Sequence, residues 1–184
     1  ATISATNGVA IYHPEKGTVT INGGTINGAT GVQMCSGELL VNGGTITATA
    51  TPKDIGNDGG IVDGAAISII NRSYPGGAPK ATITKGTFNS ASGIAAVQAY
   101  TVTEKTASAW TDAGTNVNIS GGTFSSIPDN MDALCADGYV PVKNEDGYAV
   151  QKGTYVASIG TKKFASLEAA VAAATDDDTI TLLD

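Results

Sequence analysis

The same phrase occurs four times in this sequence, and this repetition constrains the fold more than any other feature. Each copy has a glycine, a short apolar stretch, a connector, an alternating stretch, and then Gly-Gly-Thr or a close variant before an apolar residue. The copies read GVAIY with TVTINGGTI, GVQMC with LLVNGGTI, GAAIS with ATITKGTF, and GIAAV with VNISGGTF. Because repeats of this kind stack to bury a shared core, the sequence predicts a solenoid.

Alignment of the four copies predicts five apolar columns that line one interior. Small or polar residues separate the columns, which is the period of two expected of strands with one buried face. The paired glycines after the alternating stretches are expected at corners that need positive φ, and Lys85 replaces one of them. We therefore expect an all-β fold, a right-handed parallel β-helix of about four rungs, with a small C-terminal α+β cap. The columns are Val9, Val32, Ala65 and Ile94; Ile11, Met34, Ile67 and Ala96; Val19, Leu39, Ala81 and Val117; Ile21, Val41, Ile83 and Ile119; and Ile26, Ile46, Phe88 and Phe124.

Composition agrees with a β-rich chain and excludes several classes of protein. The 184 residues include 24 glycines and only 5% aromatic residues, which suits many tight turns and excludes a helical bundle. The net charge of −7 would repel nucleic acid, and no apolar run approaches the roughly 20 residues that cross a bilayer. We therefore expect neither a nucleic-acid partner nor membrane insertion. Cys35 and Cys135 are too few for a disulfide scaffold and are expected to be buried or half-buried free thiols.

The connector between the two stretches of a repeat lengthens along the chain, from HPEKG and SGE to NRSYPGGAPK (71–80) and YTVTEKTASAWTDAGT (100–115). Insertions at one corner of a solenoid project from one face, so we expect these connectors to form a ligand-binding face. Its candidate residues are His13, Glu15, Lys16, Arg72, Tyr74, Tyr100, Glu104, Lys105 and Trp110.

Trp110, the only tryptophan, has two interpretations. A large aromatic residue in a polar loop anchors a protein interface or stacks on a sugar ring. The alternative is that Trp110 folds back and packs its own loop against the repeats.

The repeats end at residue 126, so we divide the chain into the repeats (1–126) and a C-terminal segment (127–184). Residues 129–136 are expected to form a short helix, and VPVKNEDGYAV predicts a hairpin because two apolar runs flank a turn sequence. SLEAAVAAA predicts a helix with Ser166 as its N-cap and Leu167 and Val171 in its apolar stripe. A strand is expected in DDDTITLLD. This last helix and strand either cap the four repeats or open a further solenoid.

The phrases GVAIYHPEKGTVTINGGTINGATGVQM and NISGGTFSS, followed by LCADGYVPVKNEDGYAV, resemble repeats in large surface proteins of gut Clostridia and related Gram-positive bacteria. The helix and strand near the C-terminus resemble the entry to pectate-lyase-like β-helices. The resemblance covers almost the whole chain and implies a secreted module at the bacterial cell surface or cell wall. It implies adhesion to host glycans, mucin or host proteins, including immunoglobulins. Fold resemblance does not by itself establish a function.

Catalysis is the less favoured interpretation of such a fold. A polysaccharide lyase needs carboxylates around calcium and a basic residue as the base. Asp54, Asp58 and Asp63 share the insertion at 47–63 and are a weak calcium candidate, but no Arg or Lys has a fitting place in a strand. A glycosidase needs two or three carboxylates on adjacent strands, and Glu38 is the nearest to such a place. We expect no catalytic residue, no metal and no cofactor.

Three functions follow, in order of preference. The first is an extracellular, non-catalytic binding or adhesion module whose corner loops bind a host protein, such as immunoglobulin, or a glycan. The second is a structural spacer in a multi-domain surface protein, and the third is a polysaccharide lyase or glycosidase. We expect the chain to be a monomeric fragment of a larger protein, with any secretory signal upstream.

Overall fold

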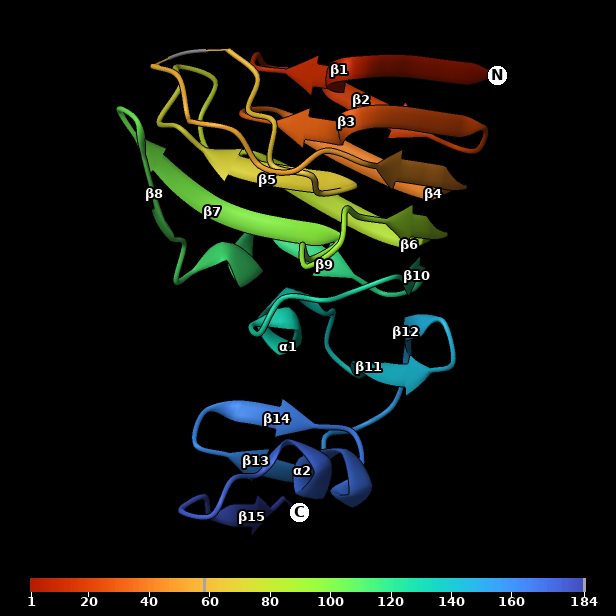
Figure 1. The fold of residues 1–184 in the computed structure, drawn as a ribbon, viewed down its shortest axis with the longest axis vertical. Coiled ribbons are helices and arrows are strands. Elements are labelled where there is room, and N and C mark those ends of the chain that lie inside the picture. Colours follow the sequence, from red (N-terminus) through yellow and green to blue (C-terminus); the bar gives the residue numbers. More distant parts are fainter. Residues whose placement is uncertain (58, 184) are drawn as a thin grey trace.

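A computed structural model describes residues 1–57 and 59–183 of the chain. Strands account for 49% of the structure and helices for 8%, so the expected β-rich class is confirmed. A 12-stranded mixed sheet curls into a half-barrel, and a separate sheet of three strands lies near the C-terminus. Figure 1 shows the strands from β1 to β10 stacked along the long axis, with the small sheet at the far end.

Most strands of the main sheet pair in parallel, as the repeats require. They are β1 (Thr2–His13), β2 (Thr18–Ile21), β3 (Thr25–Met34), β4 (Glu38–Ala48), β5 (Ile67–Asn71), β6 (Lys80–Asn89), β7 (Val97–Thr103), β9 (Val117–Ile119) and β10 (Thr123–Phe124). The first half of β3 pairs with β4 and its second half with β5, so this strand turns the sheet around a corner. The sheet is not purely parallel, because β8 (Thr106–Ala109), β11 (Tyr139–Asn144) and β12 (Gly147–Lys152) join it in antiparallel pairs.

Three of the five predicted columns are confirmed. Leu39 of β4 pairs with Val19 on one side and Ala81 on the other, and the next two columns follow the same alignment. In the last column Phe88 and Phe124 stack with ring centroids 4.8 Å apart. All three columns belong to the main hydrophobic core. Stacking of like residues therefore holds this part of the sheet together.

Side chains outside the core also stack. The Asn42 side-chain amide donates to Asn22 Oδ1 at 2.9 Å, and the Thr84 hydroxyl donates to Asn42 Oδ1 at 3.1 Å. These exposed residues form a ladder along one polar column, as expected for strands with one buried face.

The two columns predicted for the first stretch of each repeat are wrong in register. Val32 pairs with Ile11 and Ile67, two residues beyond the predicted partners Val9 and Ala65. Between β5 and β7 the observed register differs from the predicted one by a single residue, because Ile67 pairs with Val97 and not with Ala96. The observed columns are Ile11, Val32, Ile67 and Val97, and His13, Met34, Ile69 and Ala99.

The insertion at 47–63 explains this error, because it covers the outer face of β3, β5 and β7. A second hydrophobic cluster lies beneath it, made of Cys35, Ile61, Ile70 and Val102 with Tyr12, Ile55, Tyr74 and Tyr100 packed against it. Gln33, which is fully buried, holds the insertion: its Oε1 accepts from the Ile61 N–H at 2.8 Å and its Nε2 donates to the Ile61 carbonyl at 3.3 Å. Strands buried on both faces carry apolar residues on both, so the period of two is weak there.

A corner glycine gives a direct test of the stacking. Gly44 has φ of +99°, and a Cβ at this position would lie 3.0 Å from the Gly24 carbonyl oxygen of the neighbouring turn. We expect Gly44→Ala to lower the free energy of unfolding by about 1–2 kcal/mol, measured by urea denaturation. Gly23→Ala is the matched control, because a methyl group there would meet no described atom within 4 Å and its φ is not positive. Equal stability of the two variants would contradict this account of the corner.

The first part of the C-terminal segment extends the main sheet, and the part that follows forms a separate sheet. The short helix α1 (Met131–Leu134) lies within the predicted range 129–136. β11 and β12 form the predicted hairpin, and β12 pairs with β10, which extends the main sheet. The hairpin therefore belongs to the same sheet as the repeats.

The last part of the chain is a small sheet covered by one helix. It contains β13 (Ala157–Ile159), β14 (Lys162–Phe164), α2 (Leu167–Ala173) and β15 (Ile180–Leu182). Ser166 caps α2 as predicted, because its hydroxyl oxygen accepts from the Ala169 N–H at 3.1 Å. Ala170 packs on the sheet, but Leu167 and Val171 are 48% and 59% exposed, so they do not form the buried stripe predicted for them. No helix of the described residues is long and apolar enough to span a bilayer.

Candidate functional site

The connectors of the first three repeats contact one another, as the sequence predicted for one corner. The Glu38 N–H donates to the Gly17 carbonyl at 2.9 Å, and the Ser36 hydroxyl donates to the Gly77 carbonyl at 3.0 Å. Glu15 and Lys16 are exposed on the same set of connectors, whereas Tyr74 is half-buried. The enlarged loops therefore form one continuous surface over these repeats.

A hollow of about 290 Å³, here called the corner hollow, lies on this surface. Its wall combines glycines of three connectors with two lysines and one glutamate. Glu38 pairs with Lys80 in the sheet register, and Lys16 approaches from the first connector. Two lysines therefore face one glutamate in this wall, on a chain whose net charge is −7. The lining residues are Lys16, Gly17, Thr18, Gly37, Glu38, Gly76, Ala78 and Lys80.

Other predicted residues of the face lie elsewhere or are less exposed than expected. Glu104 and Lys105 form the exposed tip of the β7–β8 hairpin, where Glu104 has φ of +55°. His13 is half-buried, and its Nε2 is enclosed without a hydrogen-bond partner among the described residues. Arg72 is only 9% exposed, and its Nη1 donates to the Asn57 carbonyl at 3.2 Å. Arg72 therefore holds the insertion and is not a surface contact.

Trp110 is not an exposed anchor. Its side chain is 7% exposed and packs in the main core. The reason is a tight turn after it: the Ala113 N–H donates to the Trp110 carbonyl at 3.2 Å, and a short 3-10 helix follows at Ala113–Thr115. This turn brings the loop back onto the repeats, so the packing interpretation applies.

Asp63 is the centre of a buried hydrogen-bond network. Its Oδ1 accepts from the Thr30 hydroxyl at 2.9 Å and from the Ala65 N–H at 3.1 Å. Its Oδ2 accepts from the Ser68 hydroxyl at 2.6 Å and from the Tyr100 hydroxyl at 2.8 Å. Burial, and then the nearby Asp63 carboxylate, raise the pKa of Tyr100 far above its usual value. The hydroxyl of Tyr100 is therefore a fixed donor to Asp63.

This network bears on the weak calcium candidate. Both oxygens of Asp63 are used by protein donors, and Asp54 is exposed at the surface. Asp58 lies outside the described residues. Among the residues that are described, no group of three or more His, Cys, Asp or Glu side chains is arranged to hold a metal ion.

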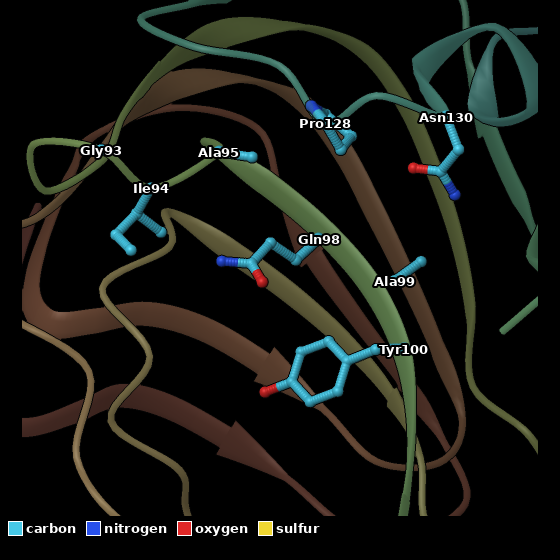
Figure 2. Close-up of a pocket in the computed structure, with 8 residues that line it drawn as sticks. All are labelled: Gly93, Ile94, Ala95, Gln98, Ala99, Tyr100, Pro128 and Asn130. Atoms are coloured by element: carbon cyan, nitrogen blue, oxygen red, sulfur yellow. The ribbon is translucent and has the colours of Figure 1, made fainter. Parts of the chain in front are cut away.

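A second hollow of about 260 Å³, here called the β7 hollow, was not predicted from the sequence. It lies beside the first half of β7, which contributes Gln98, Ala99 and Tyr100 to its wall. Figure 2 shows Gln98 and Tyr100 extending from β7 to the same side, with Pro128 and Asn130 contributed by the segment after β10. Within the described part of the chain, no side chain with a formal charge lines it. Only Tyr100 among the predicted face residues belongs to this hollow.

Neither cysteine of the described residues forms a disulfide, as predicted, and Cys35 is buried while Cys135 is half-buried. Burial raises the pKa of the Cys135 thiol to about 11. Because the thiolate is the reactive form, we expect iodoacetamide to alkylate Cys135 roughly 100-fold more slowly near pH 8.5 than it alkylates an ordinary thiol.

The rate should keep rising about tenfold per pH unit up to about pH 11, followed by mass spectrometry of the Cys135 peptide. A Cys135→Ala variant controls for labelling elsewhere. A rate that levels off near pH 9 would show that the thiol has an ordinary pKa.

Comparison of the chain with protein-family models, with curated proteins and with solved structures found no match.

Proposed function

We propose that the chain is a non-catalytic binding module of an extracellular bacterial surface protein, and that it binds a host protein or glycan through the connectors of its first three repeats. The observation that carries this proposal is the corner hollow, where three connectors from different repeats meet. Its two lysines attract a ligand with a negatively charged group, whereas the acidic remainder of the chain would repel it. The resemblance to surface-protein repeats supports the extracellular location.

We also infer that the curled sheet is a short right-handed parallel β-helix. The parallel register of β2, β4, β6 and β9, repeated with like residues in each column, supports this inference. The way in which β3 turns between two sheet partners supports it as well. Such a stack presents its connectors on one side, which is what a loop-based binding face requires.

The proposal is tested by binding of the whole chain to secreted immunoglobulin, mucin glycans and mucosal host proteins, with partners identified by mass spectrometry. The decisive comparison uses the double variant Lys16→Glu with Lys80→Glu, which reverses the charge of the corner hollow. Lys143→Glu with Lys152→Glu is the matched control, since both residues are exposed on the β11–β12 hairpin.

We expect saturable binding of one partner that the first double variant weakens about tenfold or more and the control leaves unchanged. Equal weakening by both pairs would indicate a general charge effect and would contradict the proposed face. The absence of any saturable partner would favour the structural spacer. That second function is favoured by the Asn22, Asn42 and Thr84 ladder, whose polar groups are used for stacking.

A further inference from the structure

We propose that the β7 hollow binds a single uncharged sugar unit. This site is separate from the corner hollow, and the inference does not depend on the function proposed for the connectors. Three features of the wall carry it: an aromatic ring, two free amide side chains, and the absence of formal charge among the lining residues that the structure describes.

The aromatic wall is held in place before any ligand arrives. Tyr100 lines the hollow with its ring, while its hydroxyl donates to Asp63 Oδ2 at 2.8 Å. Since Asp63 is itself fixed by Thr30 and Ser68, the ring cannot turn freely. A preorganised aromatic surface suits the C–H face of a sugar ring and reduces the entropy lost on binding.

The polar side chains of the hollow have hydrogen-bonding groups that the described residues do not use. The side-chain amides of Gln98 and Asn130 make no hydrogen bond to the described residues, although Figure 2 places both at the hollow. Each amide offers two N–H donors and one carbonyl acceptor, the groups that bind the hydroxyls of a sugar. A charged ligand would find no counter-charge on the described wall, so the wall selects for a neutral one.

The size of the hollow and the extent of the strand edge favour a sugar over a peptide. A volume of about 260 Å³ lies just below the usual range for ligand pockets and suits no more than one ring. A peptide that adds a strand needs a long free edge, but β8 already pairs with β7 from Tyr100 to Thr103. Only Val97–Ala99 of β7 lies outside that pairing, and Val97 is fully buried.

The test is a titration of the 15N-labelled full chain, followed by amide chemical shifts. The probes are glucose, galactose, mannose, fucose, N-acetylglucosamine and N-acetylgalactosamine, each taken to about 50 mM because single sugars bind proteins weakly. Glucuronic acid and an uncharged extended tetrapeptide are the comparison ligands. We expect at least one neutral sugar to give saturable shifts at the side chains of Gln98 and Asn130 and at the backbone of Ala99.

Variants locate the binding without disturbing the core. Gln98→Ala and Asn130→Ala should each weaken the sugar roughly fivefold, the effect of one lost hydrogen bond. Gln151→Ala, an exposed amide on β12, should have no effect. Tyr100→Phe keeps the ring but loses the bond to Asp63 that holds it in place, so it should weaken sugar binding less than either amide variant does. No saturable shifts, shifts that Gln98→Ala leaves unchanged, or preference for glucuronic acid or the peptide would each overturn the proposal.

Discussion

The Asp63→Ala variant is expected to lose about 3–5 kcal/mol of its free energy of unfolding. The Asp63 carboxylate accepts four hydrogen bonds and is only 8% exposed. Without it, the hydroxyls of Thr30, Ser68 and Tyr100 lose a charged acceptor, and the first two of these residues are fully buried. An unpaired buried donor costs about 1–3 kcal/mol, and this substitution affects several at once. Urea denaturation measures the loss.

Two further variants make the result specific. Asp54→Ala removes an exposed carboxylate from the same insertion and should change stability by less than about 0.5 kcal/mol. Asp63→Asn keeps the side-chain volume but turns an amide N–H₂ toward hydroxyl donors. Its free energy of unfolding should therefore lie between those of the wild type and Asp63→Ala. If Asp63→Ala loses less than about 1 kcal/mol, the network does not hold the insertion in solution.

Replacement of Trp110 by alanine should have an effect of similar size, about 3–5 kcal/mol, because it leaves a large cavity in the main core. Its fluorescence is an independent readout, since Trp110 is the only tryptophan. In the folded protein the emission should be blue-shifted, as expected of a buried indole, and it should move to longer wavelength on unfolding.

Trp110→Phe is the matched variant, because a smaller aromatic ring fills part of the space and should lose less stability. The exposed-anchor interpretation makes the opposite prediction: Trp110→Ala would remain as stable as the wild type and would lose ligand binding. The two outcomes are separated by one denaturation curve and one emission spectrum.

The sequence predicted the parts of the fold in which glycine fixes the alignment. The Gly-Gly-Thr phrases mark equivalent corners, so the columns through Leu39, Val41 and Ile46 follow from counting residues on either side. The hairpin at VPVKNEDGYAV and the Ser166 cap are local patterns with their own turn or capping chemistry. These features depend on residues close in the chain, which is why they are visible in the sequence.

The first apolar stretch of each repeat has no Gly-Gly-Thr phrase to fix its alignment with the other copies. Gly8 and Gly31 look equivalent in the sequence, but the strand pairs Val32 with Ile11. A slip of two residues keeps every side chain on its own face, so the alternation of residues does not detect it. The outer face gives no further information, because Gln33 and Ser68 lie under an insertion that looks like a polar loop in the sequence.

The candidate sites are predictable to different degrees. The corner hollow forms where repeat alignment places the connectors, so Lys16 follows from the sequence alone. The burial of Arg72 and Trp110 depends on loops that fold back through contacts far apart in sequence. The β7 hollow joins Gln98 to Asn130 across two elements, and neither residue stands out in its local sequence.

The position of Asp63 also affects how the protein unfolds. Proteins built from stacked repeats tend to unfold piecemeal from their ends, since each repeat touches only its neighbours. Here a single carboxylate joins Thr30 of β3, Ser68 of β5 and Tyr100 of β7, so one opening event breaks contacts to three successive strands. Amide hydrogens across these strands should therefore exchange with a common free energy of opening, as one cooperative unit.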